Sequence, residues 1–260
     1  WNALHPEEPV TEHALPDALI DTGVLGGDFT LPVEELREAL RACKGMILRQ
    51  EVFALDGSDK EALPYTVATH NCNIRLVQPR GGNRHASFVA LESEATSWSY
   101  ERNPADPRVG HTFNVKVDDL GNVLLAVSVV YPRKVACQSV LPDFNLKQED
   151  IGGKDAAAMQ ARHQKFLDGV QHQFHITLTE NDFTKDVIAP GSYRLRLPAA
   201  VRSYEVKGLD LPNDVYFSLA EIRNAIQHAV ATPYDYSDAP AVGILEKRLI
   251  EHVTTRYRRN

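Results

Sequence analysis

Residues 111–131 read HTFNVKVDDLGNVLLAVSVVY, two runs of alternating side chains separated by a polar turn. A period of two is typical of a β-strand with one buried face. In the first run the side chains that share a face are His111, Phe113, Val115 and Val117, and in the second they are Val123, Leu125, Val127, Val129 and Tyr131. The turn contains Gly121, which suits a tight reversal of the chain. The sequence therefore predicts an antiparallel hairpin that turns near Gly121.

Further strands are predicted on the N-terminal side of this hairpin, at residues 47–55, 65–78, 85–91 and 96–102. Each run is rich in β-branched or aromatic residues and is bounded by turn residues.

A helix is predicted ahead of these strands, at residues 33–43. Pro32 suits a first helical turn, and apolar side chains then recur at helical spacing until Gly45 ends the pattern. This helix is expected to bury one face. Cys43 is expected to belong to that buried face rather than to act as a nucleophile.

On the C-terminal side, residues 132–170 break the alternation, and the Ala-rich run at 155–170 predicts a helix. Alternation resumes at residues 174–180, which predicts a strand. Residues 193–197 also alternate, and we expect them to pair with residues 201–206.

The last part of the chain contains a helix start signal. Ser218 and Glu221 form a capping box that begins a helix running to about residue 230, and its hydrophobic staple is formed by Phe217 and Ile222. Residues 245–257 fit both a helix face and a strand face, and their β-forming residues favour a strand.

Together these elements predict a mainly β fold of antiparallel strands and hairpins with a few short helices. Four regions are expected along the chain. They are an irregular lead-in at 1–30, a helix followed by an antiparallel sheet at 31–131, an irregular segment plus a helix at 132–170, and a second β region with the capped helix at 171–260.

Composition excludes several classes of function. The 260 residues carry a net charge of −7, which disfavours binding to nucleic acid or anionic lipid. No run approaches the roughly eighteen apolar residues of a membrane helix. The cysteines Cys43, Cys72 and Cys137 lie far apart, which predicts reduced thiols rather than a disulfide framework or a zinc knuckle. The chain begins at Trp1 without a signal peptide or an initiator Met, which fits a piece of a longer protein.

Two pairs of residues invite a chemical interpretation. His172 and His175 form an HxxH pair, but an offset of three on a strand sends them to opposite faces, so no metal site is expected. His70 and Cys72 share a face of a predicted strand, but Asn71 between them points to the other face, and neither a nucleophile-elbow glycine pattern nor a helix N-terminus flanks Cys72. The glycine pairs lack the spacing of a phosphate loop. We therefore predict no catalytic, cofactor-binding or metal-ligating residue.

Residues 100–108, YERNPADPR, are polar and rich in proline. Glu101 and Asp106 would suit an acid–base pair of the glycosidase kind. Arg102 and Arg108 instead favour a proline-fixed connection held by local ion pairs, which is the interpretation we adopt.

Several runs, taken in order, resemble one family. Residues 41–57, RACKGMILRQEVFALDG, are similar to a run in the B component of bacterial insecticidal toxin complexes, the Tc toxins. The segments that follow in that family are similar to residues 64–79, 100–112 and 117–123, and later ones to residues 247–253 and 257–260. The resemblance covers nearly the whole chain from about residue 30.

The resemblance implies a structural role. The chain would be the middle-to-C-terminal part of a B component (TcB type), whose RHS-type β-strand shell encloses a toxic enzyme together with a C component. The B component also docks on a pore-forming A component. The implied location is extracellular, within a secreted toxin complex, with no cofactor and no membrane insertion by this segment. The residues of the structural motifs are Arg49, Gln50, Glu51, Tyr100, Glu101, Arg102, Asp106, Arg108 and Gly121.

Two other functions stay open from the sequence. A β-rich module that binds carbohydrate or protein would need Trp98 and Tyr100 as an exposed platform, whereas a shell wall would bury both rings. A cysteine hydrolase would need a Cys72 thiol far more reactive than Cys43 and Cys137.

Overall fold

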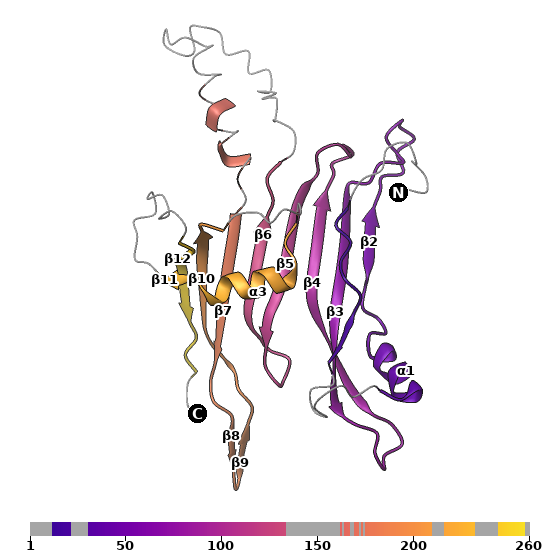
Figure 1. The fold of residues 1–260 in the computed structure, drawn as a ribbon, viewed down its shortest axis with the longest axis vertical. Coiled ribbons are helices and arrows are strands. Elements are labelled where there is room, and N and C mark those ends of the chain that lie inside the picture. The colour runs from indigo at the N-terminus through magenta and orange to yellow at the C-terminus, as the bar shows by residue number, and fades with distance from the viewer. Residues whose placement is uncertain are drawn as a thin grey trace.

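The computed structural model describes residues 12–21, 31–133, 162, 164–166, 169–171, 173, 175–209, 216–231 and 244–257. Strands dominate this part of the chain and lie side by side in one large sheet (Figure 1). The mainly β fold of antiparallel strands with short helices is therefore confirmed. Most of the helix predicted at 155–170 lies outside the described residues; residues 162, 164–166 and 169–170 are helical.

The elements follow in a simple order along the chain. They are β1 (Leu19–Asp21), α1 (Val33–Ala42), β2 (Arg49–Val52), β3 (Thr66–Gln78), β4 (Ser87–Ser99), β5 (Arg108–Val117), β6 (Val123–Val130), β7 (His175–Phe183), β8 (Val187–Ala189), β9 (Ser192–Arg194), β10 (Pro198–Lys207), α3 (Leu219–Gln227), β11 (Val230–Ala231) and β12 (Glu246–Thr254). The short strand β1 lies in the region expected to be an irregular lead-in.

Ten strands form the main sheet in the order β1-β3-β4-β5-β6-β7-β10-β12-β11, with β2 also paired to β3. The pairs from β3 to β12 are antiparallel, and the short strands β1 and β11 add in parallel. Pairing of β6 with β7 joins the two expected β regions in one sheet. Strands β8 and β9 form a separate hairpin that projects beyond the sheet (Figure 1).

The hairpin predicted at residues 111–131 is confirmed as β5 and β6, with Phe113 opposite Val127. The Asp118 carboxylate accepts hydrogen bonds from two backbone N–H groups of the turn. Gly121 has a φ of +88°, a conformation that glycine adopts without a steric penalty. Val127 and Val129 are buried, as expected for the core face.

One long strand, β4, replaces the two short strands predicted within residues 85–102. The polar residues in its middle conceal its continuity, because they interrupt the apolar pattern. Asn71 of β3 pairs with Glu94, whereas the next residue, Cys72, pairs with Glu92. Ser93 is therefore the extra residue of a β-bulge on β4. The pairing with β3 shifts by one residue at the bulge, and β4 continues on both sides of it.

The pairing predicted between residues 193–197 and 201–206 is wrong. Strand β9 pairs with β8 through a turn in which Gly191 has a φ of +77°, because this local turn closes before the chain reaches β10. Strand β10 instead lies between β7 and β12. The strand favoured within residues 245–257 is confirmed as β12.

Helix α3 crosses one face of the sheet (Figure 1). Its capping box is confirmed, since Ser218 Oγ accepts the N–H of Glu221 and the Glu221 carboxylate accepts the N–H of Ser218. Helix α3 ends at Gln227, earlier than predicted, because the chain then forms β11. Ile222 and Ile226 of α3 belong to the α3 cluster, a set of packed side chains whose buried members are Val67, Trp98, Tyr100, Val109, Phe113, Val127, Val129, Tyr131, Ile176, Leu178, Val206, Phe217, Ile222 and Ile226.

A second set of buried side chains, the α1 cluster, lies under helix α1 and consists of Leu31, Ala39, Cys72, Ile74 and Leu76. Val67 of β3 belongs to the α3 cluster, and an odd number of positions separates it from Cys72. Side chains alternate along a strand, so the two residues face opposite sides. Helices α1 and α3 therefore cover opposite faces of the sheet.

Candidate functional site

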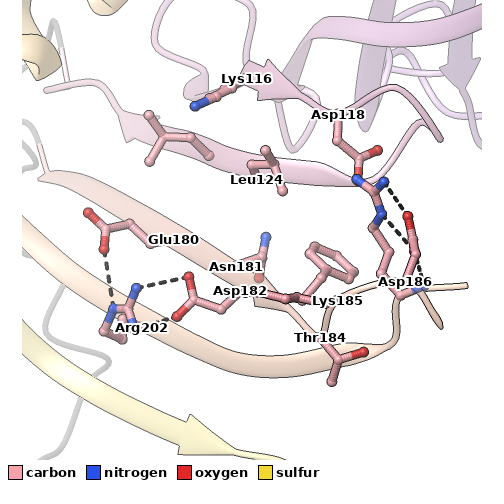
Figure 2. Close-up of a pocket in the computed structure, with 13 residues that line it drawn as sticks. Lys116, Asp118, Leu124, Glu180, Asn181, Asp182, Thr184, Lys185, Asp186 and Arg202 are labelled. Atoms are coloured by element: carbon pink, nitrogen blue, oxygen red, sulfur yellow. Dashed lines mark hydrogen bonds and ion pairs between the residues drawn. The ribbon is translucent and has the colours of Figure 1, made fainter.

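An open groove of about 880 Å³ lies where β6, β7 and β10 meet the β5–β6 turn (Figure 2). Charged side chains dominate its lining, and they are Lys116, Asp118, Glu180, Asp182, Lys185, Asp186, Arg196 and Arg202. The Arg202 guanidinium bridges Glu180 and Asp182, with nitrogen–oxygen distances of 3.2 and 2.6 Å. The groove is therefore lined by charges of both signs that neutralise one another.

A second ion-pair cluster joins two distant connections at the end of the groove. Arg196, just before β10, lies 2.9 Å from the Asp118 carboxylate in the β5–β6 turn and 2.8 Å from that of Asp186. Its hydrogen bonds lower the pKa of Asp186. Burial alone would raise the pKa of Asp118, but hydrogen bonds from Asn122 and Arg196 bring it below its usual value. Both carboxylates therefore remain ionised near neutral pH.

The pKa of Glu180 is lowered as well. Burial would raise its pKa, but the Lys247 ammonium at 2.6 Å and the neighbouring Arg202 lower it below the usual value. A glycosidase needs one carboxyl group whose pKa is raised, so that it can donate a proton. Glu180, Asp118 and Asp186 have the opposite property. The groove is thus suited to fixing elements by charge and unsuited to general acid catalysis by these three groups.

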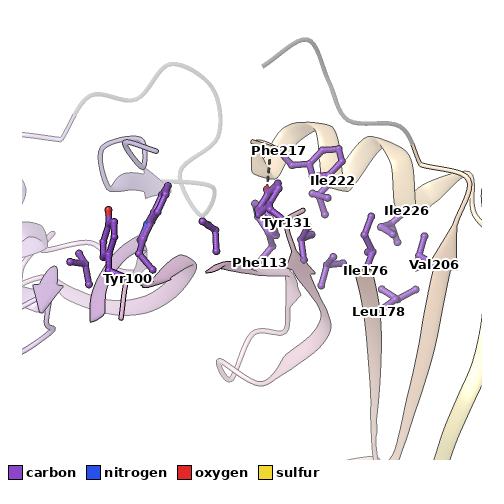
Figure 3. Close-up of a cluster of buried hydrophobic side chains, with 14 residues drawn as sticks. Tyr100, Phe113, Tyr131, Ile176, Leu178, Val206, Phe217, Ile222 and Ile226 are labelled. Atoms are coloured by element: carbon purple, nitrogen blue, oxygen red, sulfur yellow. Dashed lines mark hydrogen bonds between the residues drawn. The ribbon is translucent and has the colours of Figure 1, made fainter. Parts of the chain in front are cut away.

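The apolar side chains of the α3 cluster are drawn in Figure 3. Two buried polar side chains, His111 and Glu94, lie beside this cluster, and the His111 ring contacts that of Phe113. His111 is fully buried, and its Nε2 atom lies 3.5 Å from the buried carboxylate of Glu94. The Tyr131 hydroxyl lies 3.3 Å from His111 Nδ1 and accepts the backbone N–H of Phe217 at 3.0 Å. Burial raises the pKa of Tyr131, so its hydroxyl stays protonated. This chain of contacts ties the start of α3 to β6, β5 and β4.

Trp98 and Tyr100 stack on one another with ring centroids 6.3 Å apart, but they are only 1% and 3% exposed. The aromatic platform that a carbohydrate-binding module would need is therefore buried. The Tyr100 hydroxyl donates to Glu12 at 2.8 Å, and Glu12 also lies 2.6 Å from Arg49. Arg49 in turn pairs with Glu51 at 2.6 Å. Glu12 thus links Tyr100 to Arg49, and Arg49 links both to Glu51.

The polar run at 100–108 makes its ion pairs with distant segments rather than within itself, which corrects the expectation of local pairs. Arg102 lies 2.7 Å from Asp56 and lowers the pKa of that carboxyl to about 2. Asp106 is buried and lies 2.7 Å from Arg133. Glu101, like Arg102, has a positive φ, so two successive residues adopt the left-handed conformation that reverses the chain after β4.

The remaining motif residues occupy ordinary structural positions. Gln50 lies in β2 opposite Ala68, and Arg108 begins β5 opposite Ser99. Gly121 lies in the β5–β6 turn.

The proposed dyad of His70 and Cys72 does not have the contacts of a catalytic pair. His70 Nδ1 lies 2.9 Å from Glu92, whereas the Cys72 Sγ atom lies 3.2 Å from the Cys43 Sγ atom. Burial and the contact with Cys43 raise the pKa of Cys72 to about 12. The nucleophilic form of cysteine is the thiolate, and at that pKa almost none is present near neutral pH.

The HxxH pair is only half described. His172 lies outside the described residues, and His175 begins β7 with its Nε2 atom 3.4 Å from the Val170 carbonyl oxygen. Within the described ranges, no three His, Cys, Asp or Glu side chains gather closely enough to hold a metal ion.

Two of the contacts that sequence reasoning missed are the His111–Glu94 pair and the Cys43–Cys72 pair. For His111 a signal existed, because the alternation of the predicted hairpin places it on the apolar face with Phe113. Glu94 lies in the polar interruption of β4, where nothing in the sequence indicates burial. The contact between the cysteines depends on how α1 docks on β3, which neither local pattern specifies.

The fold and these contacts define a mainly β protein built around one large antiparallel sheet with paired charges. The family model described as insecticide toxin TcdB middle/C-terminal region matches residues 38–195, more than half of the chain. The chain belongs to this family. The comparison with curated proteins finds no match.

Three solved structures share the fold. The crystal structure of TcdB2-TccC3 has 24% identity and a TM-score of 0.54, and the same complex without its hypervariable C-terminal region has 24% and 0.53. The Tc holotoxin pore of Photorhabdus luminescens also has 24% identity and a TM-score of 0.54. Each alignment covers 78% of this chain but only 9% of the other. Among the described residues, no helix is long and apolar enough to span a bilayer.

Proposed function

We propose that the chain is a non-catalytic section of the wall of a toxin-complex B component, an RHS-type shell that encloses a toxic enzyme and helps to deliver it. Family membership supports a toxin component, and the shared fold with TcdB2-TccC3 supports a large assembly. The shell partner would be a C-type component. The A-type pore-forming component would be reached through the rest of the B component, and the complex would act as a secreted toxin.

The observation that carries this proposal is the open edge of the sheet at β12. Strand β11 pairs with β12 only at residues 246 and 247. Along residues 248–254, the described part of the chain supplies no strand on that side. The exposed fractions of Leu249, Ile250 and Val253 are 55%, 52% and 47%. Unpaired edges with apolar side chains promote association, so stable proteins cover them. Neighbouring strands of the same wall would cover this edge.

The opposite edge of the sheet, at β2, also exposes apolar side chains. Leu48, Val52 and Phe53, at and beside β2, have exposed fractions of 64%, 44% and 38%. Two edges that each leave apolar side chains in solvent fit a section that continues on both sides, rather than a closed domain.

A structural role for the charged motif residues completes the proposal. Arg49 and Tyr100 would fix the β2 edge through Glu12, while Arg102 and Asp106 would fix the connection before β5. The ionised carboxylates of the groove and the protonated Cys72 thiol support a non-catalytic role.

Hydrogen exchange in the intact B-type protein tests the edge directly. The amides of residues 248–254 should exchange as slowly as those of β6, because strands of the adjoining wall pair with them. Fast exchange at 248–254 beside a protected β6 would contradict the proposal.

A substitution tests the assembly. Ile250→Asp should reduce the amount of the B-type protein that co-purifies with its C-type partner, because a carboxylate would be buried at the covered edge. Thr112→Asp is the matched control, since Thr112 is exposed on β5 in the middle of the sheet. The payload enzyme, assayed separately, should be unaffected by either change. If both variants co-purify equally well with the C-type partner, the proposal that the β12 edge is covered within the shell wall is contradicted.

A further inference from the structure

Two thiols from different elements are in direct contact on the α1 face of the sheet. Cys43 follows the last residue of α1, and Cys72 lies in the middle of β3. Their Sγ atoms are 3.2 Å apart, although 29 positions separate the residues in the chain.

The surroundings of the two thiols differ. Cys72 is 1% exposed and packs within the α1 cluster, whereas Cys43 is partly exposed. Burial raises the pKa of Cys72 to about 12, so its thiol is protonated at neutral pH. Cys43 is thus the sulfur that a soluble reagent can reach, and Cys72 is placed to attack it from within.

We propose that Cys43 and Cys72 are a disulfide-forming pair that links α1 covalently to β3 when a low-molecular-weight disulfide such as oxidised glutathione is present. The Cys43 thiolate attacks the glutathione disulfide, which forms a mixed disulfide and releases one glutathione thiolate. Cys72 then attacks Cys43 Sγ as a thiolate, its proton having passed to water. Little of this thiolate is present at neutral pH, so the step relies on the contact between the two sulfur atoms, which makes it intramolecular. It forms the Cys43–Cys72 bond and releases the second glutathione thiolate. Two protein thiols are oxidised, and one glutathione disulfide is reduced to two thiols.

The local structure allows the sulfurs to approach. A disulfide has a sulfur–sulfur bond of about 2.05 Å, so the sulfurs must move by roughly 1 Å. The turn after Cys43 contains Gly45, which has a φ of +94° and open space around it. Before its last turn, α1 is held by two hydrogen bonds, in which the Arg80 N–H donates to the Glu35 carboxylate and the Ala86 N–H donates to the Glu38 carboxylate. The disulfide would add a covalent attachment at the other end of the helix. This inference does not depend on the function proposed above.

Peptide mapping of the intact protein tests the bond. After treatment with oxidised glutathione and blocking of free thiols with N-ethylmaleimide, trypsin should release residues 42–44 and 61–75 as one linked species that dithiothreitol separates. The linked protein should unfold about 5 °C higher than the reduced protein, because the cross-link restricts the unfolded chain. Recovery of both peptides carrying N-ethylmaleimide, or linkage of either to Cys137, would overturn the proposal.

Single variants test the order of the two steps. In Cys72→Ala, glutathione should remain on Cys43 as a stable mixed disulfide. In Cys43→Ala, Cys72 should stay unmodified over the same time, because it is buried and protonated. Cys137→Ser is the matched control and should form the linked peptides as the unmodified protein does. Equal glutathionylation of Cys72 and Cys43 in the two variants would overturn the assigned roles.

Discussion

Gly121 illustrates how a single residue determines the hairpin. It has a φ of +88°, and a Cβ atom placed there would lie 3.2 Å from Leu91 Cδ2. Gly121→Ala should therefore lower the free energy of unfolding by about 1–2 kcal/mol, since left-handed backbone is unfavourable for alanine. The measurement is the midpoint of urea unfolding. Gly82→Ala, where the added Cβ meets open space, is the control and should change it far less.

The paired carboxylates predict how stability depends on pH. In the folded chain the pKa values of Asp118 and Asp186 lie below their ordinary 3.8, and that of Glu180 lies below 4.5. As pH falls below about 4.5, the unfolded chain therefore binds protons before the folded chain does. The stabilisation is complete above that pH and is lost as pH falls through the lowered pKa values.

Thermal unfolding between pH 7 and pH 3 at constant ionic strength measures this effect. We expect the melting temperature to be nearly constant above pH 5 and to fall steeply below pH 4. Arg196→Met removes the partner of Asp118 and Asp186, so the variant should melt lower at pH 7 and show a shallower fall. A fall of equal steepness in the variant would show that these pairs do not cause it.

At the scale of single elements, the Ser218 side chain caps the N-terminus of α3. Ser218→Ala removes the acceptor of the Glu221 N–H and should cost about 1 kcal/mol. Ser218→Asp keeps an acceptor at that position and should cost little. Hydrogen exchange of the first turn of α3, compared between the two variants, measures the difference. Equal protection would mean that packing of Ile222 alone holds the helix.

Local patterns predicted the elements whose signals lie within a few residues. The alternation of β5 and β6 and the capping box of α3 correspond to observed elements. The apolar spacing predicted helix α1 correctly but not its buried face, because Val33, Leu36 and Leu40 are exposed, and the buried residues of α1 are Glu35 and Ala39. β4 and β9 were predicted incorrectly for a physical reason. The continuity of β4 depends on a bulge at Ser93 and on burial of Glu94 beside His111, which are contacts made across the sheet. The partner of β9 depends on the Gly191 turn closing first.

Contacts between segments far apart in the chain also limit what the sequence predicts of the candidate sites. Sequence placed Arg49, Tyr100 and Arg102 in structural motifs, and the structure gives each an ion pair or hydrogen bond. Their partners Glu12 and Asp56 could not be predicted, because they approach only after the strands pair.

At the scale of the whole molecule, the buried face of β6 tests whether the sheet must be intact for assembly. Val127 is 1% exposed, so Val127→Asp buries a carboxylate without a partner and should cost several kcal/mol. Less of the B-type protein should then co-purify with its C-type partner, and toxin delivery into cells should fall. Ser128→Asp, at the adjacent exposed position, should leave both unchanged. Normal assembly of a folded Val127→Asp protein would argue against the proposal that this chain forms part of the shell wall.

The order of the strands has a consequence for biosynthesis. From β3 to β7 each strand pairs with the one that precedes it in the chain, and β10 and β12 then add on the same side. Strands that leave the ribosome in this order can join the growing sheet one at a time, mostly by closing short loops. Each new strand covers the edge that the previous one exposed. A nascent chain would thereby keep its unpaired strand edges away from neighbouring nascent chains on the same polysome.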